Sequence, residues 1–191
     1  LDFRELGLRY ERTALSLVRK IGKLVTEGLL SENKQSLPWE ASCIIVDLSR
    51  TSAEHQMLMM DYIIRLASRY YIGRSDLFIV IEEAHRFIPN RNFVSPMIKR
   101  ILFKDLRANV NICLVTSRVS SCNQSILSAS GLQIIHKITN TWDLNALMKI
   151  SEFLDESYRK KIQRLFKGEA LVCGVSMPFP VFVRIHHPIR G

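Results

Sequence analysis

The stretch FIVIEEAHRF, residues 78–87, joins a run typical of a buried strand to two adjacent carboxylates. Phe78–Ile81 are four apolar residues in succession, a pattern typical of strands buried on both faces of a parallel sheet. Glu82 and Glu83 follow directly. Because ligands of parallel α/β sheets bind at the carboxyl ends of the strands, we expect the two glutamates to lie at the edge of a binding site.

Three other segments show the same pattern, in which an apolar run ends in polar residues. They are CIIVDLS (43–49), NICLVTS (111–117) and LQIIHKITN (132–140). Their polar ends are Asp47 and Ser49, Thr116 and Ser117, and Asn140. Helical periodicity separates them, so we predict an α/β fold with a mainly parallel sheet flanked by helices, and with these polar residues along one edge.

Further elements are predicted on both sides of this sheet. Helices are expected over 8–30, from about 51 to 71, and over 97–107, 142–150 and 151–166. The tail GEALVCGVSMPFPVFVRIHHP (168–188) predicts two strands joined by a proline-rich turn, which together form a C-terminal β-hairpin.

Composition limits the class of protein. The 191 residues are 47% hydrophobic and 24% charged, which is typical of one globular domain. No stretch reaches the roughly 18 apolar residues of a membrane span, and the first residues lack the apolar centre of a signal peptide, so a cytoplasmic protein without a membrane partner is expected. The net charge of +9 favours a polyanionic partner, nucleic acid first and an acidic membrane surface second.

Two carboxylates at the end of one strand can serve two chemical purposes. Adjacent residues point in different directions, so one carboxylate can hold a hydrated Mg²⁺ while the other orients or deprotonates a water. That division suits nucleotide hydrolysis. The alternative is a pair of solvated glutamates at a helix start, where the helix dipole favours negative charge.

The order of motifs resembles a known family. IVIEEAHRFIP (79–89) resembles the Walker B segment of the HerA/FtsK-type ATPases, hexameric RecA-like motors that translocate on DNA, and the HerA branch is the closer match. The resemblance extends from about Cys43 to Pro188. Other matching stretches, in the family's order, are IIVDLS (44–49), IKRILFKDLRANVNICLVTSRVS (98–120), IIHKITNTWD (134–143) and the closing strands.

The resemblance implies roles for individual residues. Glu82 takes the position that holds Mg²⁺ through water, and Glu83 takes that of the catalytic base. Ser117 stands where the family has a glutamine that senses the γ-phosphate of ATP, although a serine is too short to span the same gap. Arg107 falls at the basic pair that reaches a neighbouring subunit's nucleotide, with Leu106 in the other place.

Three more positions match the same family. Arg118 follows the sensing position, and Asn140 with Asp143 matches a polar pair beyond it. For DNA contact, the candidates are Arg86 and Arg91 in the loop after the glutamates. His85 either senses the nucleotide or DNA, or caps the local turn.

One motif of the family is missing from this sequence. No G-x-x-x-x-G-K-[ST] phosphate loop occurs in it. The resemblance therefore implies the C-terminal portion of a RecA-like ATPase domain, with a helical lead-in (1–40), a βα core (41–140), and helices with a hairpin (141–191). Without the loop, we expect this chain alone not to hydrolyse ATP.

The expected function is that of an ATP-dependent DNA translocase or helicase. The resemblance implies ATP as substrate with Mg²⁺, double-stranded DNA as partner and a hexameric ring, and it leaves room for a nuclease partner. Two alternatives remain from the sequence. One is a non-catalytic DNA-binding or assembly subunit derived from such an ATPase, and the other is an unrelated hydrolytic enzyme of α/β class that uses the glutamate pair.

Overall fold

The computed structural model describes residues 19, 22, 37–71, 76–90, 94–103 and 110–186. The chain divides into two compact units, Leu1–Met60 and Asp61–Gly191, each of which is described by itself. Arg19 and Gly22 are helical, and the rest of the helix predicted over 8–30 lies outside the described residues. Within these described ranges, no helix is long and apolar enough to cross a membrane.

The first unit corrects one prediction. Residues 43–49 carry no strand, and Ile45 is 89% exposed. A strand needs a partner for its backbone groups, and no described strand pairs with this segment. Asp47 instead closes a local turn by accepting the Ser49 N–H at 2.8 Å. This backbone hydrogen bond lowers the pKa of the Asp47 carboxyl. The polar end of the segment is therefore a turn that follows an unpaired stretch of chain.

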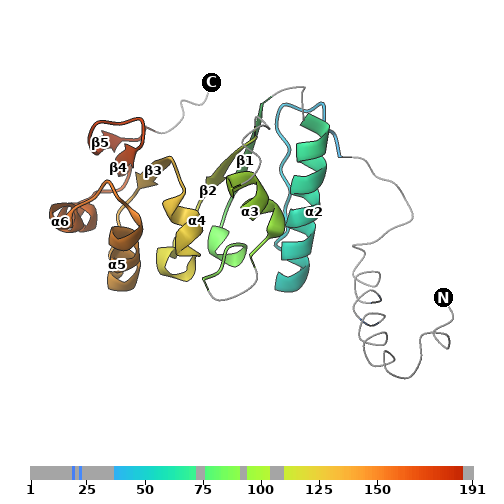
Figure 1. The fold of residues 1–191 in the computed structure, drawn as a ribbon, viewed down its shortest axis with the longest axis horizontal. Helices are drawn as coiled ribbons and strands as arrows, with labels where there is room; N and C mark the ends of the chain where they lie inside the picture. Colours follow the sequence, from blue (N-terminus) through green and yellow to red (C-terminus); the bar gives the residue numbers. More distant parts are fainter. Residues whose placement is uncertain are drawn as a thin grey trace. The chain divides into compact units, whose positions relative to one another are not determined.

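The second unit contains the predicted parallel strands. Helix α2 (Ala53–Tyr71), which begins in the first unit, precedes β1 (Leu77–Ile81), and helix α3 (Pro96–Phe103) separates β1 from β2 (Val110–Leu114). The two strands pair in parallel with Leu77 opposite Val110 and Ile81 opposite Leu114 (Figure 1). The parallel pair that the apolar runs predicted is therefore confirmed, and its carboxyl ends lie side by side.

Helices α2 and α3 are joined through one carboxylate. Asp61 in α2 accepts hydrogen bonds from the Ser95 hydroxyl at 2.6 Å and from the Met97 N–H at 2.9 Å. The second of these satisfies a backbone donor in the first turn of α3, where helices have free N–H groups. The chain between β1 and β2 is thereby anchored to α2.

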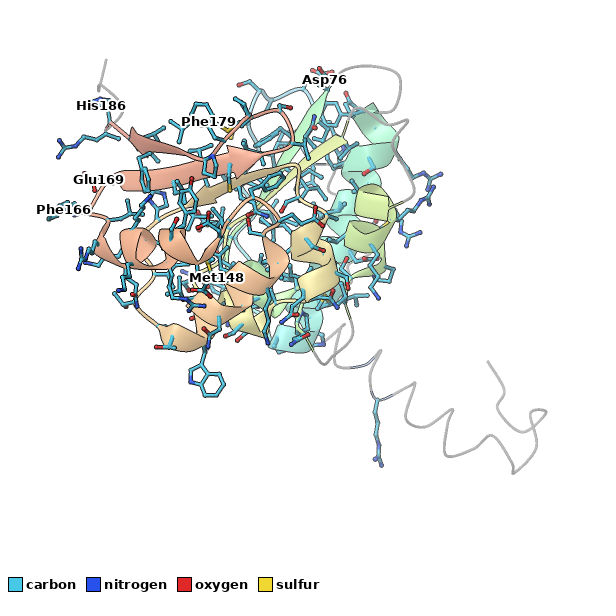
Figure 2. The ribbon with its side chains drawn as sticks, turned by 60° about the vertical axis from the view of Figure 1, so that its left-hand side comes forward. Asp76, Met148, Phe166, Glu169, Phe179 and His186 are labelled. Atoms are coloured by element: carbon cyan, nitrogen blue, oxygen red, sulfur yellow. The ribbon has the colours of Figure 1, made fainter. Side chains whose placement is uncertain are left out.

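A second sheet holds the remaining strands. Strands β3 (Leu132–Ile135), β4 (Glu169–Gly174) and β5 (Val181–Arg184) form an antiparallel sheet in the order β3-β4-β5. Figure 2 shows Glu169 and His186 at one end of the β4–β5 hairpin and Phe179 in the turn at the other. The predicted hairpin is confirmed.

The direction of β4 explains why the parallel part of the fold is small. Two helices, α5 (Thr141–Ile150) and α6 (Glu156–Arg164), lie between β3 and β4. Parallel neighbours need a crossover that brings the chain back to the same end of the sheet, whereas the connection through α5 and α6 enters β4 antiparallel to β3. The α/β class holds, with two parallel strands and three antiparallel ones.

The core of this region lies between the second sheet and its helices. Its buried residues come from β3, β4, α5 and α6: Ile135, Leu144, Leu147, Ile162, Leu171 and Cys173. Asn140 begins α5 and Asp155 begins α6 by accepting backbone N–H groups of the first turn. The hydrogen bonds from Ser157 lower the pKa of the Asp155 carboxyl.

Candidate nucleotide site at the ends of two parallel strands

The segments that follow β1 and β2 run side by side. We call residues 82–90 the β1 loop and residues 115–123 the β2 loop. Three backbone hydrogen bonds join them: Ala84 N–H to the Val115 carbonyl at 2.9 Å, Asn90 N–H to Ser121 at 2.9 Å and Asn123 N–H to Ile88 at 2.7 Å. The β1 loop contains a short helix, η2 (Ala84–Arg86), and the β2 loop contains η3 (Val119–Ser121). The two loops therefore form one structure at the carboxyl end of the parallel strands.

Glu83 has an unusual backbone conformation. Its φ of 50° and ψ of 43° are left-handed, and among the described residues it is the one non-glycine residue with positive φ. Such a conformation costs a side-chain-bearing residue roughly 1 kcal/mol or more and persists where neighbouring contacts fix it. Here the Glu83 carbonyl accepts the Arg86 N–H, and the next residue, Ala84, is bonded to the β2 loop. Strain of this kind clusters at functional sites.

His85 connects Glu83 to the β2 loop. Its Nδ1 lies 3.2 Å from Oε2 of Glu83 and 3.5 Å from the hydroxyl of Thr116. The sequence left open whether His85 caps a local turn or serves the site, and the structure places it against both loops. Thr116 was predicted only as a polar strand end. No pattern in one sequence pairs it with a histidine 31 positions earlier, because the contact depends on strand register.

The backbone of Arg118 is fixed on both sides, although its side chain is exposed. Its N–H donates to the Thr116 hydroxyl at 3.1 Å. Its carbonyl accepts from the Ser121 N–H at 3.2 Å and from the Cys122 thiol at 3.4 Å. Burial raises the pKa of Cys122, which keeps the thiol protonated and able to donate. Arg118 therefore presents an exposed cation from a backbone that is hydrogen-bonded on both sides.

The other predicted site residues fall in different places. Glu82, Glu83, Ser117 and Arg118 are exposed and lie in the two joined loops. Arg86 is also exposed, in η2. Asn140 is the N-cap of α5, where its Oδ1 accepts from the Trp142 N–H at 2.8 Å. Arg91 and Arg107 lie outside the described residues.

The acidic pair offers two carboxylates that could serve as ligands of a metal ion. Among the described residues, no group of three or more His, Cys, Asp or Glu side chains could hold a metal. Mg²⁺ in nucleotide sites is bound by one or two carboxylates, several waters and the substrate phosphates. Two exposed glutamates at a strand end match that set, whereas an all-protein cage would need more ligands.

Sequence comparison finds relatives among archaeal helicases. The chain is 32% identical over 130 residues to the DNA double-strand break repair helicase HerA of Pyrococcus furiosus, covering 66% of this chain and 24% of that protein. It is 30% identical over 122 residues to the probable HerA of Methanocaldococcus jannaschii, covering 63% and 24%. The chain thus spans about a quarter of the length of these curated relatives. No family model matches it.

Solved structures share the fold at lower sequence identity. The genome packaging NTPase B204 of Sulfolobus turreted icosahedral virus 2, in complex with ATP-gammaS, aligns with a TM-score of 0.65 at 15% identity, over 84% of this chain and 76% of that one. The DNA-packaging ATPase B204 of Sulfolobus turreted icosahedral virus aligns with a TM-score of 0.61 at 17% identity, over the same shares. The fold class predicted from the strand pattern is confirmed. Over 66% of its length this chain is similar in sequence to the HerA helicase of Pyrococcus furiosus, and its fold is similar to that of the packaging NTPases.

Proposed function

We propose that this chain is the C-terminal portion of the RecA-like ATPase domain of an ATP-dependent DNA translocase or helicase of the HerA type. The observation that supports this most directly is the site itself: two glutamates leave β1 beside the end of a parallel neighbour, and Glu83 is held there in a left-handed conformation. The relatives named HerA helicase support the same function.

The site residues divide the chemistry between them. Glu83 serves as the base that orients and deprotonates the attacking water, with His85 Nδ1 beside its carboxylate. Glu82 holds the water shell of Mg²⁺, which when bound neutralises charge on the phosphates. Arg118 and Ser117, in the adjacent β2 loop, face the transferred phosphoryl group. A serine reaches less far than the family's glutamine, so Arg118 carries most of that interaction.

The rest of the site comes from outside this chain. The phosphate loop lies in a preceding part of the ATPase, so this chain alone does not turn over ATP. Arg107 completes the site of a neighbouring subunit in a hexameric ring.

Arg86 and Arg91 contact the phosphates of double-stranded DNA, so DNA binding weakens as salt concentration rises.

The test is Glu83→Gln in the complete ATPase that contains this chain. Gln is nearly the same size but cannot accept a proton, so turnover falls by about 100-fold to 10,000-fold while ATP still binds. Glu152→Gln is the matched control, because Glu152 is also an exposed glutamate but lies between α5 and α6. Unchanged turnover in Glu83→Gln removes Glu83 from the mechanism. A wild-type protein that binds DNA without ATP turnover is instead the non-catalytic relative.

A further inference from the structure

Asp143 is a buried carboxylate outside the acidic pair. It lies in the first turn of α5 and is 6% exposed. Its Oδ1 accepts two hydrogen bonds from a single residue, from the Ser120 N–H at 2.8 Å and from the Ser120 hydroxyl at 2.8 Å. Burying a carboxylate costs several kcal/mol unless hydrogen bonds compensate, so this contact is a main reason the group is tolerated there.

Ser120 links Asp143 to the segment that carries Arg118. Ser120 lies two residues after Arg118, in the β2 loop. The other end of the same short segment is held by the Thr116 hydroxyl, which accepts the Arg118 N–H and lies beside His85. Arg118 is therefore placed between two anchors, one next to the acidic pair and one on α5.

A simpler role for Asp143 does not explain its geometry. An acidic residue in the first turn of a helix interacts favourably with the helix dipole. That interaction needs no burial and no second partner, and Asn140 already caps this helix. The Asp143 carboxylate is instead buried against a loop 23 residues earlier in the chain.

We propose that Asp143 is a positioning residue that fixes the β2 loop and, through it, the direction from which Arg118 reaches the ends of β1 and β2. The role of Arg118 toward phosphate rests on the proposed function. The hydrogen-bonded connection between α5 and the β2 loop does not, so it can be measured without any nucleotide.

The first experiment uses the 191-residue chain and backbone ¹⁵N relaxation. In Asp143→Ala, the order parameters of residues 117–120 fall from about 0.85 to below about 0.6, because the anchor at Ser120 is lost. In Asp143→Asn they stay near the wild-type value, since an amide oxygen can accept the same two hydrogen bonds. The proposal is overturned if residues 117–120 of a folded Asp143→Ala chain keep wild-type order parameters. It is also overturned if these order parameters fall as far in Asp143→Asn as in Asp143→Ala.

A milder variant covers the case in which Asp143→Ala does not fold. Ser120→Ala removes the hydroxyl contact and keeps the backbone one. We expect an intermediate fall in the same order parameters, with amides in β3 and β4 unchanged. Order parameters of residues 117–120 that stay at the wild-type value in Ser120→Ala contradict the proposal.

The second experiment measures coupling in the complete ATPase. Asp143→Ala lowers kcat by about 100-fold, the cost of misplacing a group by about 1 Å, and changes KM little. In an Arg118→Ala background the same substitution lowers kcat by less than about 3-fold, because residues that act as a unit are non-additive. Additive losses assign Asp143 a role independent of Arg118 and overturn this step. If the wild-type ATPase has no turnover, the proposed function fails. The relaxation experiment still tests whether Asp143 of α5 fixes the β2 loop.

Discussion

The parallel pair β1–β2 and the antiparallel sheet β3-β4-β5 are stabilised in different ways. Beyond the parallel strands, the β1 and β2 loops are joined by backbone hydrogen bonds and by the contact of His85 with Thr116, and the β2 loop is bonded to Asp143 of α5. Apolar packing contributes there too, because Ala84, Ile88 and Cys122 are fully buried. The antiparallel sheet is held by an apolar cluster beneath α5 and α6. The comparison indicates that the candidate chemistry lies where polar contacts and a strained backbone are added to buried apolar packing.

Both regions also contain strands with one exposed apolar side. In β3, Ile135 is 6% exposed while its neighbour Ile134 is 56% exposed. In β1, Ile81 is buried while Phe78 is 66% exposed. Each of these strands therefore has a stabilising face and a face whose apolar residues contribute little within this chain, which the following substitutions test.

The largest effect is expected for Ile135→Ala. The side chain belongs to the buried cluster with Leu144 and Leu171, so its loss leaves a cavity that costs about 2–5 kcal/mol of unfolding free energy. Ile134→Ala is a matched control on the same strand and costs at most about 1 kcal/mol, because that side chain is already in solvent. Urea denaturation of both variants measures the difference. Equal losses would show that the two faces of β3 are equally packed.

An intermediate effect is expected for Gly174→Ala at the end of β4. A Cβ there would collide with the Gly131 carbonyl oxygen and lie 3.0 Å from Leu132 Cα, both backbone atoms at the start of β3. Separating the two strands costs about 1–3 kcal/mol. At Gly131 a Cβ would meet only Val175 Cγ2 at an ordinary 3.6 Å, so Gly131→Ala is the control and changes stability by about 0.5 kcal/mol or less. Thermal melts of the two variants test whether close approach of β3 and β4 limits this position.

The smallest effect is expected for Phe78→Thr in β1. Thr keeps the preference for a strand, and most of the Phe78 ring is in solvent, so the free energy of unfolding changes by about 0.5 kcal/mol or less. Denaturation of this chain provides the measurement. A loss above about 1 kcal/mol would mean that the outer face of β1 is covered in solution, and the contrast between Phe78 and Ile81 would then disappear.

The sequence predicted the strand β1 better than it predicted how the strands pair. The apolar run before Glu82 indicated a strand that the structure confirms, because continuous hydrophobicity next to a polar end is a local signal. Strand pairing, by contrast, depends on contacts between distant parts of the chain. The strand predicted over 43–49 finds no partner among the described residues. Of LQIIHKITN (132–140), Leu132–Ile135 form a strand, and it joins an antiparallel sheet.

Contacts between distant residues were also beyond prediction. The role of Asp143 toward Ser120 depends on how α5 meets the β2 loop, and the approach of His85 to Thr116 depends on the register of β1 and β2. The same sequence pattern would be compatible with other registers. The predicted roles of Glu82, Glu83, Ser117, Arg118 and Asn140 stay predictions, as do those of Arg91 and Arg107.

At position 83, the left-handed backbone favours glycine, whereas the proposed chemistry requires a carboxylate. Glycine adopts that conformation without a steric penalty, so exchanging Glu83 for glycine would relieve the backbone while deleting the carboxylate. A selection for thermostability alone would therefore favour the loss of Glu83. Its presence in a chain under that pressure would be a sign that catalysis, and not folding, maintains it.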